Sequence, residues 1–172
     1  MGSEVYTGRV SPSEKASLRP ATPEDLPVLV DLEKRVQVAP WTVAHFEAEL
    51  SKPYSRFLVL TDDETDSQIF GYLVFWMMFD EGQILNVGVA SEHRNQGHGL
   101  TMVRQAVKEC LQKNLKRVVL DVRKSNLPAI QLYQKVGFLV GSVQKALYSN
   151  GEDGYSMELS LQGEDAAKLL DF

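Results

Sequence analysis

The fold of this chain is decided by the stretch Arg94-Asn95-Gln96-Gly97-His98-Gly99, which lies between an apolar, strand-like run at 84–89 and an amphipathic run with helical spacing. The first backbone N–H groups of a helix have no partner inside it, and the helix dipole adds partial positive charge there. A glycine-containing turn between a strand and a helix therefore predicts a phosphate-binding loop. Gly97 and Gly99 would allow unusual backbone angles and a close approach, and Arg94 would add positive charge.

Two common phosphate-binding loops are excluded. The chain has no G-x-x-x-x-G-K-[ST] motif, which an NTPase loop requires. Gly99 is followed by Leu-Thr-Met, so the dinucleotide motif G-x-G-x-x-G also fails. What remains is R-x-x-G-x-G between a strand and a helix. Taken alone, these six residues fit a glycine-containing turn beside a solvated arginine equally well.

Another motif follows at 125–138 and reads S-N-L-P-A-I-Q-L-Y-Q-K-V-G-F. Together the two motifs resemble those of the GNAT superfamily of acetyl-CoA-dependent N-acetyltransferases. The motif at 94–99 is similar to that family's pyrophosphate-binding loop, and the motif at 125–138 is similar to its later strand–helix segment. Both occur in the family's order and at its spacing. The resemblance extends from Leu18 to Leu161, nearly the whole chain.

Within the superfamily, the chain is most similar to the RimI type, the ribosomal-protein-alanine N-acetyltransferases. The similarity rests on Pro40-Trp41-Thr42 ahead of a helix, on Leu85-Asn86-Val87-Gly88-Val89 before the loop, and less uniquely on Leu120-Asp121-Val122-Arg123. It implies an α/β, single-domain GNAT fold, with a mixed and mostly antiparallel sheet flanked by helices. It also implies acetyl-CoA as cosubstrate and no metal.

The resemblance assigns the cofactor contacts residue by residue. The matching positions are Val87, Val89, Arg94, Asn95, Gln96, Gly97, His98, Gly99, Asn126 and Tyr133. In the family the loop binds through its main chain, so the side chain of His98 is expected in solvent. A backbone N–H of Val87 or Val89 is expected to polarise the thioester carbonyl. Gly88, between them, fits a β-bulge that would free these amides.

Tyr133 is the first candidate for a catalytic side chain. In RimI-type enzymes the matching tyrosine is the general acid, which protonates the CoA thiolate as the tetrahedral intermediate collapses. A phenol with a pKa of about 10 suits a thiol leaving group with a pKa of about 8.5. On the local sequence alone, the alternative is a helix tyrosine that packs its ring and leaves its hydroxyl in solvent.

Asp121 is the other catalytic candidate. It lies between Leu120 and Val122 in an apolar strand, and period-two alternation places it on the opposite face from them. RimI-type enzymes have Glu here, assigned as the general base; Asp loses roughly 1.5 Å of reach, which one bridging water would restore. The alternative is a structural Asp that accepts backbone N–H bonds or pairs with Arg123 or Lys124.

The acceptor side is less well defined. Trp41 resembles the RimI peptide-groove segment, and Tyr148 matches a family tyrosine that lines the acceptor site; each could instead be a core or surface residue. The resemblance implies acetylation of a protein N-terminus, with the alanine of a ribosomal protein as first candidate. A small amine or a lysine side chain is the enzymatic alternative. A non-catalytic acetyl-CoA-binding module is the third, which Tyr133 and Asn126 argue against.

Composition excludes several classes of protein. The chain has 172 residues, a one-domain length, with a net charge of −5 and a pI near 5.2. This acidity argues against direct nucleic-acid binding and suits a cationic acceptor such as an amine or a basic peptide. The single Cys110 excludes an intramolecular disulfide and a cysteine-rich zinc site, and the three histidines show no metal-ligand spacing.

The longest uncharged apolar run, Ile69–Phe79, is too short for a membrane-spanning helix, which needs about 20 residues. We therefore expect a protein that does not enter membranes. We further expect it to be cytoplasmic and to be a monomer or a weak dimer. Composition and patterning predict a mobile tail at 1–17, one α/β domain at 18–161, and a tail or short helix at 162–172. Strands are expected at 18–20, 56–61, 69–79, 83–90, 117–122, 138–148 and 154–161, and helices at 22–37, 41–50, 100–111 and 126–136.

Overall fold

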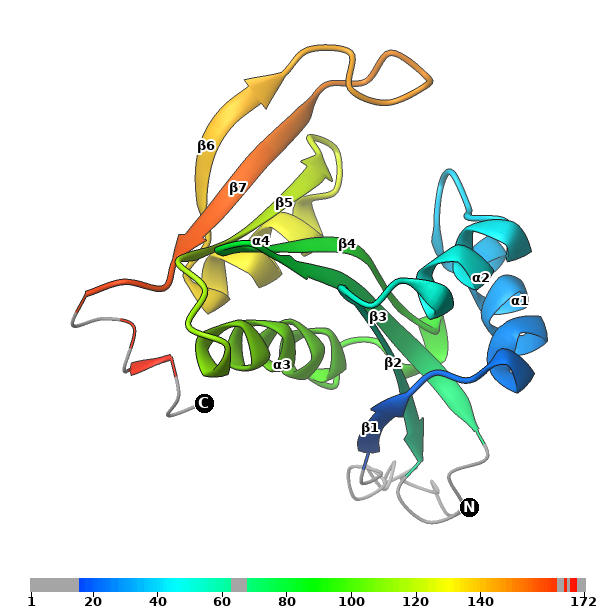
Figure 1. Cartoon of the computed structure of the whole chain (residues 1–172). Coiled ribbons are helices and arrows are strands. Elements are labelled where there is room, and N and C mark those ends of the chain that lie inside the picture. The colour runs from blue at the N-terminus through cyan, green and yellow to red at the C-terminus, as the bar shows by residue number, and fades with distance from the viewer. Residues whose placement is uncertain (1–15, 63–67, 164–165, 167, 170–172) are drawn as a thin grey trace, which may run out of the picture.

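The computed structural model describes residues 16–62, 68–163, 166 and 168–169 (Figure 1). Its strands are β1 (Ala16–Pro20), β2 (Ser55–Asp62), β3 (Ile69–Met78), β4 (Glu81–Val89), β5 (Arg117–Arg123), β6 (Leu139–Gln144) and β7 (Gly154–Ser160). Its helices are α1 (Leu26–Val36), α2 (Val43–Ser51), α3 (His98–Gln112) and α4 (Leu127–Val136), with short 3₁₀ turns η1 (Pro23–Asp25) and η2 (Ser91–His93).

The strands form one seven-stranded sheet in the order β1-β2-β3-β4-β5-β7-β6. Neighbours are antiparallel except β4 and β5, which are parallel and pair only over Glu81–Ile84 and Arg117–Leu120. Beyond these residues the two strands diverge, as Figure 1 shows. The expected mixed, mostly antiparallel sheet is confirmed. In its one parallel pair, β4 and β5 separate after Ile84 and Leu120.

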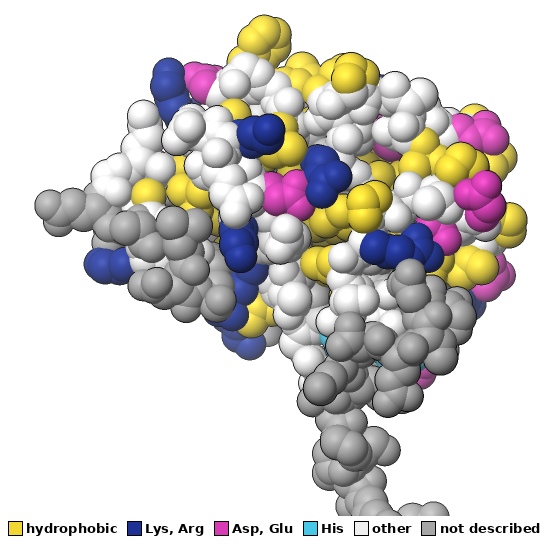
Figure 2. Space-filling model, turned by 60° about the horizontal axis from the view of Figure 1, so that its bottom comes forward, with side chains coloured by type: hydrophobic (Ala, Val, Ile, Leu, Met, Phe, Trp, Pro, Cys, Tyr) yellow, Lys and Arg dark blue, Asp and Glu magenta, His cyan; other side chains and the backbone are white. Residues whose placement is uncertain are grey.

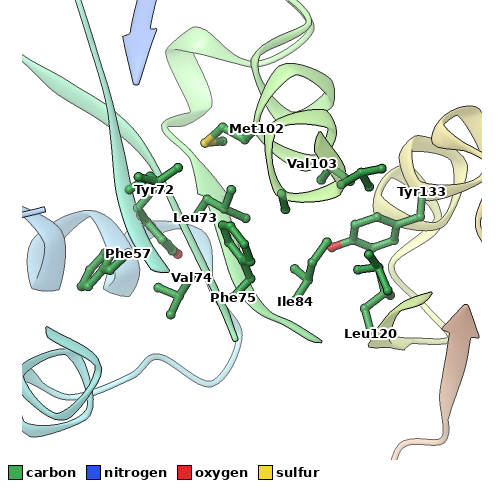
Figure 3. Packing of buried hydrophobic residues seen from close by; sticks show 14 of the residues in the cluster. Phe57, Tyr72, Leu73, Val74, Phe75, Ile84, Met102, Val103, Leu120 and Tyr133 are labelled. Carbon is green, nitrogen blue, oxygen red and sulfur yellow. The ribbon is translucent and has the colours of Figure 1, made fainter. Parts of the chain in front are cut away.

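Helices cover the centre of the sheet. Residues Phe70–Phe75 of β3 are all buried, so neither face of this strand is in water, as its apolar sequence predicts. The ring of Tyr72 meets that of Phe46 in α2 at 5.9 Å between centroids. Figure 3 shows the buried side chains running from Phe57 and Tyr72, beside α1 and α2, to Val103 and Tyr133, beside α3 and α4.

Local side-chain and backbone chemistry sets the helix boundaries. The side chain of Thr42 caps α2 by accepting from the backbone N–H of His45, and Asn126 caps α4 by accepting from that of Ala129. Gly137 ends α4 with a φ of 115°, a left-handed conformation that favours glycine. These caps fix the start of α4 beside the opening of the sheet.

Every strand boundary lies within two residues of the sequence-based expectation except the end of β6. β1 begins at Ala16, inside the expected tail, and the rest of that tail lies outside the described residues. β6 ends at Gln144 instead of Tyr148, because Ala146 takes a positive φ of 48° and its N–H is held by Asp153. Of the expected C-terminal segment, 164–165, 167 and 170–172 are not described; the N–H of Leu169 donates to the carbonyl of Ala166.

None of the described helices combines the length and the apolarity that crossing a membrane would require. On the face shown in Figure 2, lysine and arginine side chains are interspersed with acidic and apolar ones.

Cys110 is buried in the core on α3, directly beneath Gly82 of β4. Burial raises the pKa of its thiol to about 12, so the reactive thiolate is scarce at neutral pH. We predict that Cys110 does not react with Ellman's reagent in the native protein at pH 8 and reacts fully in guanidinium. Rapid labelling of the native protein would contradict this burial.

Candidate active site

Two cavities flank the opening between β4 and β5. The first, of about 460 Å³, is lined by the loop after β4 and by the first turns of α3 and α4. The second, of about 630 Å³, is lined by β5, by the segment between α1 and α2, and by Tyr148. The residues that line both cavities are Val36, Gln37, Val87, Asn126, Ala129 and Leu132. The cavities therefore meet at Val87, on the edge of β4 that β5 no longer covers.

A bulge in β4 lies just before this meeting point. Asn86 pairs with Val74 and Ile84 pairs with Phe75. Leu85, between them, therefore has no partner residue in β3. Gly88 pairs regularly with Tyr72, and the expectation of a bulge at Gly88 is wrong. Glycine is needed there for another reason, since a Cβ at this position would overlap the ring and hydroxyl of Tyr72.

Replacing Gly88 by alanine should therefore destabilise the fold by about 1–3 kcal/mol, the usual cost of overpacking a core. The matched control is Gly141→Ala on the edge strand β6, where a Cβ would meet only ordinary contacts. Thermal unfolding of both variants checks this. A melting temperature for Gly88→Ala equal to that of Gly141→Ala would contradict the packing of Tyr72.

The N–H and C=O groups of Val87 and Val89 face the opening. Ala90 donates its N–H to the carbonyl of Phe70 in β3. Backbone groups point to alternate sides along a strand, so those of Val87 and Val89 point away from β3. Consistent with this, the carbonyl of Val87 accepts from Gln37 Nε2 at 3.0 Å and that of Val89 from Arg94 Nε at 3.0 Å. Because both groups of a strand residue point to the same side, the two N–H groups face the cavities as well.

The loop at 94–99 forms the start of α3. Gly97 is the N-cap, with a φ of 84°, and a Cβ there would meet open space. Gly99 has no positive φ; it is small because a Cβ would lie 2.8 Å from Leu132 of α4. Only the first glycine thus serves the loop conformation, and the second lets α3 and α4 approach. Asn95 also takes a positive φ, of 59°.

The side chains of this loop are placed in three ways. Arg94 is exposed and folds back onto the carbonyl of Val89 at the mouth of the first cavity. Gln96 does not line either cavity and reaches the carbonyl of Glu92 at 3.5 Å. His98 is half-buried with its ring 5.1 Å from Phe70, so the expectation of a solvent-exposed side chain is wrong.

Tyr133 lies on the inner face of α4 and lines the second cavity. It is 8% exposed, and Figure 3 shows its hydroxyl directed toward Ile84 of β4. Burial, and to a lesser degree Tyr148, raises the pKa of this phenol to about 12. The expectation of a hydroxyl near its ordinary pKa is wrong, because the ring is taken out of water against Phe138.

Asp121 faces Tyr148 across the second cavity. It is exposed between the buried Leu120 and Val122, as strand alternation predicts. Burial raises the pKa of Tyr148, and the negative charge of Asp121 adds to this effect. Asp121 is not paired in the way the structural alternative supposed, because Arg123 binds Glu152 at 3.1 Å and Lys124 lies 3.6 Å from Asp153.

Arg123 holds Tyr148 in place. Its guanidinium carbon lies 3.9 Å from the centre of the Tyr148 ring. Its partner Glu152 also accepts from the backbone N–H of Ser125 at 3.0 Å, just before α4. The segment after β6 is thereby fixed against β5 and the start of α4, and Tyr148 forms a wall of the second cavity.

The sequence did not predict a polar cluster of Glu33, Gln37, Tyr72 and Asn86, and all of these except Tyr72 line the second cavity. Glu33 is fully buried and accepts from the backbone N–H of Trp41 at 2.9 Å. Trp41, half-buried against Phe46, lines the second cavity. The sequence did contain a signal for this cluster. Glu33 follows Leu32 and lies four residues after Leu29, so it falls on the buried face of α1, where a charged side chain requires partners.

Comparison with known proteins gives the family of this fold and site. The model of the acetyltransferase (GNAT) family matches residues 26–138. A Bacillus subtilis (strain 168) protein, provisionally named a ribosomal protein bS18-alanine N-acetyltransferase, is 37% identical over 86% of this chain and 97% of its own length.

Two solved structures share the fold. The ribosomal-protein-S18-alanine N-acetyltransferase from Escherichia coli superimposes with a TM-score of 0.78 at 24% identity, over 88% of this chain and 98% of its own. Mutant forms of the spermidine/spermine N-acetyltransferase SpeG from Vibrio cholerae superimpose at 0.71 and 17%, over 91% and 96%. The chain belongs to the acetyltransferase (GNAT) family.

Proposed function

We propose that this protein transfers the acetyl group of acetyl-CoA to the α-amine of a protein N-terminus, with the N-terminal alanine of a ribosomal protein as first candidate. The observation that carries the proposal is the meeting of a loop-lined cavity and a tyrosine-lined cavity at Val87. The Bacillus subtilis relative, which this chain matches over nearly its whole length, supports the choice of acceptor. A ribosomal-protein acceptor would place the reaction in the cytoplasm.

The first cavity suits the pyrophosphate of acetyl-CoA. The first amides of α3 have no partner within the helix, the left-handed Gly97 leaves open space beside them, and Arg94 adds positive charge. The side-chain oxygen of Asn126 caps α4, so its side-chain NH2 group would donate to the cosubstrate. Acetyl-CoA would supply the activated acetyl thioester.

The second cavity suits the acceptor. Trp41 and Tyr148 would line the peptide groove, and Asp121 would take the proton that the amine must lose. Asp121 reaches less far than Glu, so we infer that the proton passes through one water. Ordinary α-amines have a pKa of about 7.7–8.0, so part of the acceptor is neutral at physiological pH without help.

The transfer forms a carbon–nitrogen bond and breaks a carbon–sulfur bond and an N–H bond. The amine nitrogen bonds to the thioester carbon and loses a proton, the carbon–sulfur bond breaks, and the sulfur leaves with its electron pair. The N–H of Val87 would stabilise the negative charge that develops on the carbonyl oxygen. Tyr133 would donate a hydrogen bond to the leaving sulfur.

The raised pKa of Tyr133 changes its expected role. A phenol with a pKa of about 12 keeps its proton more tightly than a thiol with a pKa of about 8.5. Complete proton transfer to a free CoA thiolate would therefore be uphill. Tyr133 would act mainly by stabilising negative charge on sulfur as the bond breaks, and the proton could reach the sulfur later from solvent.

The enzymatic alternative is a small amine or a lysine side chain, because the exposed Asp121 at an open cavity suits any cationic acceptor. Release of free CoA, followed with a thiol reagent, distinguishes these acceptors. An alanine-terminated peptide should release CoA, whereas spermidine and an N-blocked lysine peptide should not. Release with spermidine alone would refute the proposal. Binding of acetyl-CoA without release for any acceptor would identify a non-catalytic module.

A further inference from the structure

The polar cluster touches both walls of the site and holds the backbone of two residues to which the proposed function gives a role, Val87 and Trp41. The carboxylate of Glu33 accepts from the hydroxyl of Tyr72, from Asn86 Nδ2 at 3.1 Å and from the backbone N–H of Trp41 at 2.9 Å. Three donors compensate a fully buried charge. One carboxylate thus ties the acceptor wall, through Trp41, to the strand that faces the cosubstrate, through Asn86.

Gln37 continues this cluster to the meeting point of the cavities. Its Nε2 lies 2.9 Å from Asn86 Oδ1, 3.0 Å from the carbonyl oxygen of Val87 and 3.1 Å from the hydroxyl of Tyr72. The two hydrogens of the amide are shared among these three acceptors. Gln37 also lines both cavities, so this anchor lies directly beside the reaction site.

The contact with Val87 replaces a missing strand neighbour. Paired strands hold one another's carbonyls in place, but the pairing of β5 with β4 ends at Ile84. The bulge at Leu85 loosens the ladder on the other side one residue before Asn86. The carbonyl of Val87 is held instead by the Gln37 side chain, which fixes the orientation of the Val87 N–H on the same edge.

We propose that Glu33 and Gln37 are positioning residues that align the two substrates, by holding the Val87 edge for the thioester and the Trp41 backbone for the acceptor. This inference rests on the proposed function. Misplacing reacting groups by about 1 Å can cost roughly 100-fold in rate even when binding is intact. A positioning role therefore predicts a lower kcat with little change in the KM for acetyl-CoA.

The test is Gln37→Met, which keeps the length of the side chain and removes the donor. The control is Gln134→Met on the exposed face of α4, outside both cavities. We expect kcat to fall about 10- to 100-fold in Gln37→Met. The KM for acetyl-CoA should stay within about threefold, the melting temperature should stay near that of the wild type, and the control should be unchanged.

A kcat for Gln37→Met within twofold of the wild type would overturn the inference. So would a parallel loss of kcat, acetyl-CoA affinity and melting temperature, since this would indicate a structural role alone. If Gln37→Met does not fold, Gln37→Glu tests the same point. It keeps the size of the side chain and replaces the donating amide nitrogen with an accepting oxygen. A wild-type protein that acetylates no amine would instead refute the proposed function.

Discussion

Tyr133→Phe should lower kcat by about 100-fold or more, the usual loss when a group that stabilises transition-state charge is removed. Tyr133 lines the second cavity, and its hydroxyl is the only group the substitution deletes. The ring keeps its contact with Phe138, at 5.9 Å between centroids, so the melting temperature should change little. Steady-state kinetics with acetyl-CoA and an alanine peptide measure the effect.

The pH dependence provides a further check on Tyr133. Because burial raises its pKa to about 12, the phenol carries its proton throughout the range from pH 6 to 10. The wild-type rate should rise with deprotonation of the amine, at about pH 7.7–8.0, and should show no fall from Tyr133 below pH 10. Near-wild-type activity of Tyr133→Phe would remove this residue from the reaction.

Asp121→Asn should lower kcat/KM by about 10- to 100-fold at pH 7, because it removes the carboxylate that would accept the amine proton. The loss should shrink above pH 8, where most of the amine is already neutral. Asp121 is exposed and faces Tyr148 across the cavity, so the substitution should leave the fold intact. A pH–rate profile of wild type and variant measures both effects.

The matched variant is Asp121→Glu, which keeps the carboxylate and lengthens its reach. It should retain at least the wild-type rate if the proton passes through Asp121, with or without a water. If Asp121→Asn has the wild-type rate at every pH, the amine loses its proton to solvent, and orientation and carbonyl polarisation account for catalysis.

The parts of the site that lie within one continuous segment were predictable. The strand–loop–helix order around Gly97 depends on neighbouring residues, and this prediction of local structure is confirmed. The family resemblance predicted a mixed, mostly antiparallel sheet, but neither it nor any local pattern was used to predict that β4 and β5 are the parallel pair. Local chemistry thus predicted the elements, and the resemblance predicted the class of sheet.

Features that depend on contacts distant in sequence were missed. Gln37 and Asn86 meet across 49 residues, and no periodicity in either segment shows this. The bulge lies at Leu85, which has no sequence signature, while Gly88 is glycine because of Tyr72 on the neighbouring strand. The raised pKa of Tyr133 likewise depends on packing, which composition does not reveal.

The acceptor cannot be chosen from the fold. The solved structures that share it include one that acts on a ribosomal protein and one named for spermidine and spermine. In the proposed function, the surface that would discriminate between acceptors is the second cavity, which Trp41, Asp121 and Tyr148 line. Direct identification of the modified atom is therefore required.

The central claim is acetylation of a protein α-amine, and the most direct measurement is mass spectrometry of a matched pair of peptides incubated with acetyl-CoA and the protein. One peptide has a free N-terminal alanine and an internal lysine, and its twin is blocked at the N-terminus. We predict one acetyl group on the free peptide, located on the alanine by fragmentation, and none on the blocked twin. Acetylation of the blocked twin, or of neither peptide, would contradict the claim.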